Sequence, residues 1–330
     1  MEGNLTAVGV WREPDEGGFV KKLKAAGLMF AAVVLAGGAA QGQMPAPLLA
    51  RPSSLPPMKS LAVLGQKIAY YEVGTGSTLV LVHGFGTQAY FDWGLVIPEL
   101  ARRHHVLAMD QIGFGNSDKP FIDYSVQTYV DFLGEFLRTL KVDHFDLAGE
   151  SLGGWIAASY TLQALSPENS GPYALPRPER LILEDAAGHT DPFHRAGAQP
   201  QVGPIPISGN LKDAAGVAIV FHDKSRVTEE FIRRDFALKM KANDGMTERL
   251  FTSNPRLSSE VVGDKLGGIT IPTLVVWGEN DELVPLADGR DYAAKIPNAR
   301  LVIVSECGHA PSIEKPQQFI DAVEGFLKAR

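Results

Sequence analysis

Short runs of consecutive apolar residues alternate with segments of helical periodicity along most of this chain. A continuous short apolar run is typical of a strand that is buried on both faces of a parallel sheet. Such runs occupy residues 78–82, 105–109, 144–148, 181–183, 273–277 and 301–304. Before them, residues 61–64 and 67–73 are separated by Gly65-Gln66, and a two-residue break of this kind indicates a hairpin.

Helical patterns fill the segments between these runs. Residues 125–140 and 316–327 carry apolar side chains at helical spacing. Strands and helices that alternate in this way predict an α/β fold, with a mostly parallel central sheet and helices on both faces. The alternation stops at residues 188–268, which hold few strand-like runs but a clear helical pattern at 229–238.

We therefore expect a core built from residues 59–187 and 269–330, with residues 188–268 inserted as a helical cap. The cap carries several large apolar side chains that either line an apolar pocket or pack as ordinary cap core. These side chains are Phe193, Phe221, Phe231, Phe236, Met240 and Phe251.

The N-terminal residues 1–40 have a different character. The basic cluster Lys21-Lys22-Leu23-Lys24 precedes an uncharged apolar run that ends in small residues near Ala40. This order predicts an export signal that is cleaved near Ala40, and hence a periplasmic or secreted protein. An uncleaved membrane anchor is the alternative, although the run is short for a membrane span. Residues 41–58 are rich in Pro, Ala and Ser and are typical of a linker.

Composition narrows the classes of function. The chain has 330 residues, and its net charge of −7, with no basic cluster in its body, argues against a nucleic-acid partner. The single cysteine, Cys307, excludes an intrachain disulfide and a multi-cysteine zinc site. The histidines show no metalloprotease spacing. We expect no cofactor and no metal, a small-molecule substrate, and contact with a membrane only through an uncleaved N-terminal segment.

The most specific chemical signal is Gly149-Glu150-Ser151-Leu152-Gly153, which lies between a predicted strand and a predicted helix. A Gly-x-Ser-x-Gly sequence in this context is the nucleophile elbow, a tight turn that exposes the serine hydroxyl. A free hydroxyl is barely ionised at neutral pH, so Ser151 needs a histidine base that is oriented by a carboxylate.

Both partners of Ser151 have candidates in the chain order that this fold requires. His309 follows the predicted strand 301–304, and Asp281 follows the predicted strand 273–277. Other acids remain open as partners of the histidine. They are Glu279, Glu282 and Asp185.

An oxyanion hole needs two hydrogen-bond donors near the nucleophile. The backbone N–H of Leu152, directly after Ser151, is the first expected donor. The second is the N–H of Phe85 in His83-Gly84-Phe85-Gly86, which follows the predicted strand 78–82. The alternative for this loop is a plain turn that uses glycine for its backbone freedom.

At this point the chain resembles the α/β-hydrolase superfamily from about residue 59 to 330. The resemblance rests on the elbow and on four further motifs. These are His83-Gly84-Phe85-Gly86, the segment 110–118, Gly278-Glu279-Asn280-Asp281 and Gly308-His309. They are most similar to the capped branch that holds small esterases, cofactor-free haloperoxidases and meta-cleavage product hydrolases. Relatives that use an aspartate nucleophile, the haloalkane dehalogenases and epoxide hydrolases, do not match Ser151.

The resemblance implies a serine hydrolase that cleaves an ester-like or activated carbonyl bond of a small, largely apolar substrate through Ser151, His309 and Asp281. Carbon–carbon bond hydrolysis and perhydrolysis use the same triad and remain alternatives. The residue before the nucleophile is Glu150 in this chain, whereas many relatives carry His or Asn at that position. It hints at ester chemistry or serves as a structural carboxylate, and we expect hydrogen bonds to it if it is buried.

Two rival hypotheses belong to other classes of function. Gly84-Phe85-Gly86-Thr87-Gln88-Ala89 with Asp110 fits a dinucleotide-binding pattern, but that interpretation leaves Ser151, Asp281 and His309 unexplained. Some α/β-hydrolase relatives only bind ligands, and an apparently complete triad argues against this role.

Overall fold

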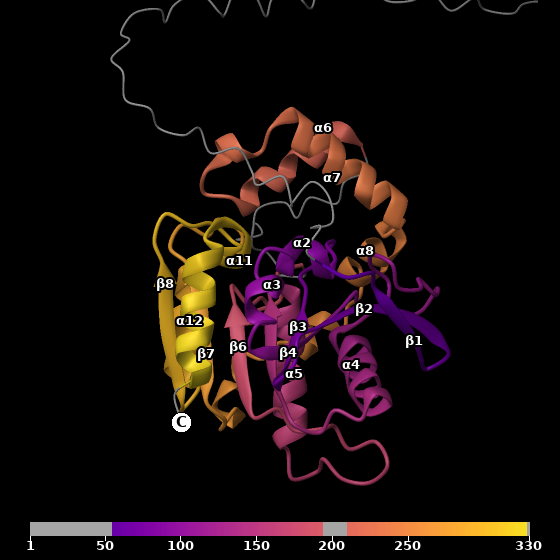
Figure 1. The fold of residues 1–330 in the computed structure, drawn as a ribbon, viewed down its shortest axis with the longest axis vertical. Helices are drawn as coiled ribbons and strands as arrows, with labels where there is room; N and C mark the ends of the chain where they lie inside the picture. The colour runs from indigo at the N-terminus through magenta and orange to yellow at the C-terminus, as the bar shows by residue number, and fades with distance from the viewer. Residues whose placement is uncertain (1–54, 194–209, 329–330) are drawn as a thin grey trace, which may run out of the picture. The chain divides into compact units, whose positions relative to one another are not determined.

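The computed structural model describes residues 55–193 and 210–328, and there eight strands form one sheet (Figure 1). Their order across the sheet is β1-β2-β4-β3-β5-β6-β7-β8. β1 and β2 form the predicted hairpin, β2 pairs antiparallel with β4, and all later neighbours are parallel. The mostly parallel sheet is thereby confirmed. The strands are β1 Lys59–Val63, β2 Gln66–Val73, β3 Ser77–Val82, β4 His104–Met109, β5 Phe145–Glu150, β6 Arg180–Glu184, β7 Thr273–Gly278 and β8 Ala299–Val304.

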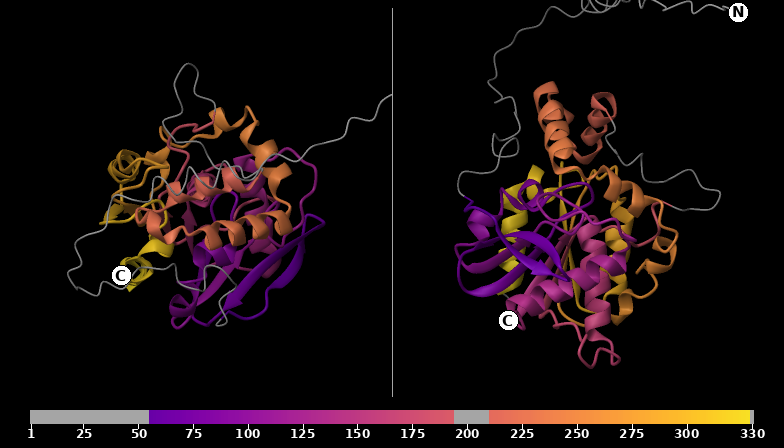
Figure 2. Two further views of the ribbon diagram at one scale, coloured as in Figure 1. Left: turned by 90° about the horizontal axis from the view of Figure 1, so that it is seen from above. Right: turned by 90° about the vertical axis from the view of Figure 1, so that its right-hand side faces the viewer.

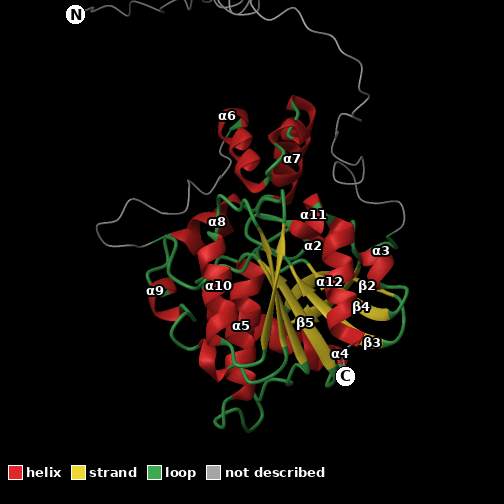
Figure 3. Cartoon of the chain, turned by 90° about the vertical axis from the view of Figure 1, so that its left-hand side faces the viewer, coloured by secondary structure: helices red, strands yellow, loops and turns green. Residues whose placement is uncertain are grey.

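Helices cover both faces of the sheet (Figure 3). One apolar cluster joins the inner sides of α4, α5 and α10 to one face. A second joins α2, α3 and α12 to the other face. The helices of the core, with the short α11 included, are α2 Ala89–Trp93, α3 Ile97–Leu100, α4 Val126–Leu140, α5 Leu152–Leu165, α10 Leu286–Lys295, α11 Pro311–Glu314 and α12 Pro316–Lys328. The alternation of buried strands and amphipathic helices therefore produces the layered core that it predicts.

Strand β5 is longer than its apolar run indicates. The sequence pattern ends at residue 148, whereas the strand continues through Glu150. Gly149 pairs with Val82 of β3, and Glu150 pairs with Glu184 of β6. Pairing on both sides extends the strand up to the turn at Ser151. It also places the acidic residues Glu150 and Glu184 side by side on neighbouring strands.

The insertion after β6 is helical in its described part and lies beyond the carboxyl ends of the parallel strands (Figures 1 and 2). A third apolar cluster attaches it to the core, with Phe221 and Phe231 packed against Phe91 and Ile313. Its helices are α6 Leu211–Ala214, α7 Glu229–Ala242, α8 Gly245–Thr252 and α9 Leu257–Glu260, with 3₁₀ turns at Ala215–Val220, Lys224–Arg226 and Leu266–Gly268.

The expected export signal in residues 1–40 lies outside the described residues, as does most of the expected linker 41–58. Within the ranges that the structure covers, no helix has both the length and the apolar character of a membrane span.

Candidate active site

Ser151 lies at a sharp turn between β5 and α5. Its backbone angles, φ 51° and ψ −115°, fall in a region that residues other than glycine rarely adopt. A Cβ atom at Gly149 would collide with the backbone of Gly153, and one at Gly153 would collide with the backbone of Val82. The close approach of strand and helix therefore requires both glycines, and the turn presents Ser151 to a pocket.

His309 and Asp281 form a buried pair at the end of β7 and β8. The Nδ1 atom of His309 lies 2.7 Å from Oδ2 of Asp281. The other oxygen of Asp281 accepts hydrogen bonds from the backbone N–H groups of Leu283 and Val284, at 2.7 and 2.9 Å. Two backbone donors keep Asp281 in place, so its free oxygen can orient the ring of His309.

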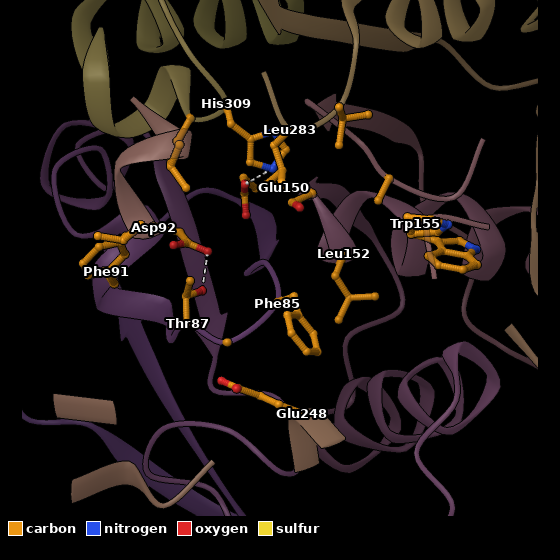
Figure 4. A pocket seen from close by; sticks show the side chains of 18 of the residues that line it. Phe85, Thr87, Phe91, Asp92, Glu150, Leu152, Trp155, Glu248, Leu283 and His309 are labelled. Atoms are coloured by element: carbon orange, nitrogen blue, oxygen red, sulfur yellow. Dashed lines mark hydrogen bonds and ion pairs between the residues drawn. The ribbon is translucent and has the colours of Figure 1, made fainter. Parts of the chain in front are cut away.

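The second ring nitrogen of His309 lies close to Glu150. Nε2 lies 3.5 Å from Oε1 of Glu150 and makes no hydrogen bond within the described residues. Figure 4 shows Glu150 directed toward His309 at one end of the pocket. No hydrogen bond joins Ser151 and His309 in the described part of the chain, and such bonds often tighten only when substrate is present.

Hydrogen bonds connect the loop that carries His309 to the cap. The backbone N–H of His309 donates to the carbonyl of Val220 in the cap, at 2.7 Å. The carboxylate of Glu314 accepts from Gly308 at 2.7 Å and from His222 and Asp223 of the cap at 3.1 and 2.9 Å. Docking of the cap therefore fixes the backbone on which the histidine stands.

Within the part of the chain that the structure describes, the two expected oxyanion donors are unpaired. Neither the N–H of Phe85 nor that of Leu152 donates to another group among the described residues. Both residues line the pocket with Ser151, and Leu152 opens helix α5, where N–H groups have no partner within the helix. The Phe85 loop is held by His83, whose Nδ1 lies 2.8 Å from the Gly84 carbonyl and whose Nε2 accepts from Gln111 N–H at 2.9 Å.

Glu150 is buried among other acids, and no hydrogen bond to it from a described residue provides the donor that the sequence leads us to expect. Only 4% of the residue is exposed, and a Cβ atom at Gly84 would collide with its carboxyl group. Burial, followed by the nearby charges of Asp92 and Glu184, raises the pKa of Glu150 well above its usual range. The raised pKa favours the form of Glu150 that carries a proton, and a carboxyl group in that form can donate a hydrogen bond to a neighbouring acid such as Asp92.

Asp185, the other acid near the histidine, is also fully buried. Its Oδ1 accepts from the N–H of Gly278 at 2.9 Å, and its Oδ2 has no hydrogen-bond partner among the described residues. Burial and the charge of Asp281 raise the pKa of Asp185 well above its usual range. Asp281 is the acid of the pair that contacts the imidazole directly. Glu279 is exposed, and Glu282 pairs with Lys224 at the surface.

Asp185, Asp281 and His309 are the described residues whose atoms could together hold a metal ion, since they lie within 4.8 Å of one another. The arrangement fits a metal poorly. Asp281 and His309 already share a short hydrogen bond, and a protonated Asp185 is a weak ligand.

Glu184 makes stability depend on pH in a defined direction. Burial raises its pKa from 4.5 to about 8. Between these values the folded chain keeps a proton that the unfolded chain has lost, so the free energy of unfolding falls as pH rises. Glu184→Gln keeps the acceptor for the N–H of Ser312 and removes this titration. Between pH 5 and 8 we expect the free energy of unfolding to fall less steeply with pH in the variant than in the wild type. The two slopes should differ by up to about 1 kcal/mol per pH unit.

Urea unfolding of both proteins across this pH range measures the difference. Parallel stability curves for the wild type and Glu184→Gln would show that Glu184 is ionised in the folded chain.

The pocket beside Ser151 is lined by both the core and the cap. Of the six cap side chains that either line a pocket or pack as cap core, Phe193 and Phe251 line it. Phe221 and Phe231 are buried in the cluster that attaches the cap, and Met240 is 60% exposed. Phe236 is not among the residues that line the pocket either. Val217, Val220 and Leu238 supply further apolar lining from the cap.

The dinucleotide hypothesis is not supported by the position of Asp110. Its carboxylate is fully buried and accepts from the N–H of Ala89 at 2.9 Å and from Asn116 at 2.8 and 2.9 Å. These contacts fix the loop between β4 and α4, and they leave no exposed oxygen for a ribose.

Comparison with known proteins agrees with this geometry. A family model described as the alpha/beta hydrolase family matches residues 79–322. The 2-hydroxy-6-oxo-2,4-heptadienoate hydrolase of Pseudomonas putida is 29% identical over 78% of this chain and 92% of its own. The pimeloyl-[acyl-carrier protein] methyl ester esterase of Aeromonas hydrophila is 28% identical over 77% of this chain and 96% of its own.

Solved structures are similar over the same region. A meta-cleavage product hydrolase matches with a TM-score of 0.72 and 25% identity, covering 84% of this chain and 99% of its own. Together with the family model, which spans more than half of the residues, this likeness confirms the resemblance seen in the sequence. The chain belongs to the alpha/beta hydrolase family, and it is a hydrolase by that membership.

Proposed function

We propose that this hydrolase cleaves an ester-like bond of a small substrate through a covalent acyl-enzyme on Ser151. The observation that carries the proposal is the arrangement of Asp281 and His309, 2.7 Å apart, beside a serine at a strained elbow. The comparisons support hydrolysis, and the bond and the substrate are part of the proposal.

In the first step, Nε2 of His309 takes the proton of Ser151 as the hydroxyl oxygen attacks the substrate carbonyl. The negative charge that forms on the carbonyl oxygen is held by the N–H groups of Phe85 and Leu152. Asp281 stabilises the protonated imidazole, which then gives its proton to the leaving alcohol.

In the second step, water attacks the acyl-enzyme. His309 takes a proton from the water, and the collapse of the second tetrahedral intermediate returns it to Ser151 and releases the acid. The apolar lining from Phe85, Phe193 and Phe251 suits a substrate with an apolar body.

Carbon–carbon bond hydrolysis is the second candidate, because several similar proteins carry such names. One is the 2-hydroxymuconate semialdehyde hydrolase of a Pseudomonas species, 27% identical over 82% of this chain and 93% of its own.

Turnover of p-nitrophenyl butyrate and of 2-hydroxy-6-oxo-2,4-heptadienoate by the purified protein separates the two candidates. Ester hydrolysis with a higher kcat/KM supports the proposal. A higher kcat/KM for the dienoate would favour the second candidate, and turnover of neither substrate would contradict both.

A further inference from the structure

Glu248 is a buried acid that lines the pocket. It lies on α8 of the cap, and only 5% of the residue is exposed. Its side chain makes no hydrogen bond or ion pair among the described residues. Figure 4 shows Glu248 pointing into the pocket at the end away from His309, with Phe85 between them.

The lysine whose charge acts on Glu248 is paired with another acid. Lys239 on α7 pairs with Asp235, with Nζ 3.3 Å from Oδ2. Burial raises the pKa of Glu248, the charge of Lys239 lowers it, and the charge of Asp235 raises it. A buried polar group without a partner costs free energy, and natural sites retain such groups when a ligand satisfies them.

The backbone opposite Glu248 leaves room for its carboxylate. Gly86 has φ +67°, and a Cβ atom there would lie 2.9 Å from Oε1 of Glu248. The same loop carries Phe85, one of the expected oxyanion donors. A group held by Glu248 would therefore belong to a substrate whose carbonyl reaches Ser151.

The sign of the charge around the pocket selects among such groups. Its described lining includes one lysine, Lys239, and several acids. These acids are Asp92, Glu150, Asp235, Asp244, Glu248 and Asp288. A substrate carboxylate would enter beside these acids, and the one lysine of the described lining already pairs with Asp235, so burying a further negative charge there is costly.

We propose that Glu248 binds a hydroxyl or ammonium group of the substrate, so that the enzyme prefers esters with such a donor over apolar or carboxylate-bearing ones. This inference rests on the proposed ester hydrolysis and adds the substrate class. It also disfavours substrates such as the dienoates named for several relatives, because these carry a carboxylate.

The test compares matched esters that differ in one terminal group. The first series consists of the p-nitrophenyl esters of ω-hydroxyhexanoic, heptanoic and adipic acids, which differ at the end of the acyl chain. The second series consists of acetate esters of p-nitrophenols whose ring carries a chain with the same three end groups, so that the difference lies on the alcohol side. In at least one series we expect the wild type to prefer hydroxyl over methyl by about tenfold in kcat/KM, with the carboxylate poorest. Glu248→Leu should reverse the hydroxyl preference.

Two controls separate a binding role from a structural one. Glu230→Leu makes the same substitution on the exposed side of α7, where Glu230 pairs with Arg234, and it should leave the preference unchanged. A structural role for Glu248 predicts a lower Tm in Glu248→Leu. The proposed role predicts an equal or higher Tm, because the variant removes an unpaired buried carboxylate.

Equal preferences in the wild type and Glu248→Leu in both series would overturn the proposal. This outcome is distinct from failure of the proposed ester hydrolysis, in which no ester would be hydrolysed at all. In that case calorimetry with ω-hydroxyhexanamide and heptanamide still decides. Tighter binding of the hydroxy amide that is lost in Glu248→Leu supports the subsite, and equal binding contradicts it.

Discussion

Ser151→Ala should lower kcat for ester hydrolysis by about 10⁴-fold or more, since the variant has no nucleophile to form the acyl-enzyme. Substrate binding should change little, because the oxyanion donors and the apolar lining remain. The substitution removes no contact between the hydroxyl and the core, so the Tm should stay within a few degrees of the wild type. Initial rates and thermal unfolding of the purified variant measure both expectations.

Ser159→Ala is the matched control. Ser159 lies on the same helix α5, is 8% exposed, and does not line the pocket beside Ser151. We expect wild-type kcat from this variant. Retention of more than a few per cent of activity in Ser151→Ala would show that another group attacks the substrate.

Asp281→Asn should lower kcat by roughly 10³- to 10⁴-fold with a small change in KM. The asparagine keeps the shape of the side chain, but it removes the charge that stabilises protonated His309 and it disturbs the tautomer of the ring. A kcat that falls while KM stays constant marks the loss of a contact that strengthens in the transition state.

Asp185→Asn tests the competing acid in the same assay. Burial, followed by the charge of Asp281, raises the pKa of Asp185 well above its usual range and so favours its neutral form in the folded chain. Its replacement by a neutral amide should therefore cost less than about tenfold in kcat. Equal losses in both variants, or a larger loss in Asp185→Asn, would assign the orienting charge to Asp185.

The sheet and the order of the site residues are predictable from the sequence because their signals are local. An apolar run forms a buried strand wherever helices can cover it, and each run of the core became a strand. Glycines on both sides of Ser151 indicate a tight turn, and the collisions that a Cβ would cause there explain the pattern. Asp281 and His309 are predictable in the same way, because each directly follows an apolar run that forms a strand.

The identity of the acid beside His309 is less local. Glu279, Asp281 and Glu282 lie within four positions, and the backbone path of the loop decides among them. The N–H groups of Leu283 and Val284 hold Asp281 inward, whereas Glu282 turns outward to Lys224. Which direction a loop residue takes depends on hydrogen bonds that no sequence pattern records.

The environment of Glu150 could not be predicted for a similar reason. Its neighbours Asp92 and Glu184 come from a helix and a strand that are distant in the sequence. Two extra residues of strand pairing bring Glu150 beside Glu184. Glu248 likewise lacks a signal, because an acid on a cap helix resembles an ordinary solvated charge until the pocket is known.

Mass spectrometry of the protein after reaction with a fluorophosphonate tests the central claim most directly. Such reagents phosphonylate an activated serine, so we predict one adduct per chain, on the peptide that contains Ser151. Labelling should be lost in Ser151→Ala and strongly slowed in His309→Ala, because the serine then lacks its base. An adduct on a different residue, or an unmodified protein under conditions that label a known serine esterase, would contradict the assignment of Ser151 as the nucleophile.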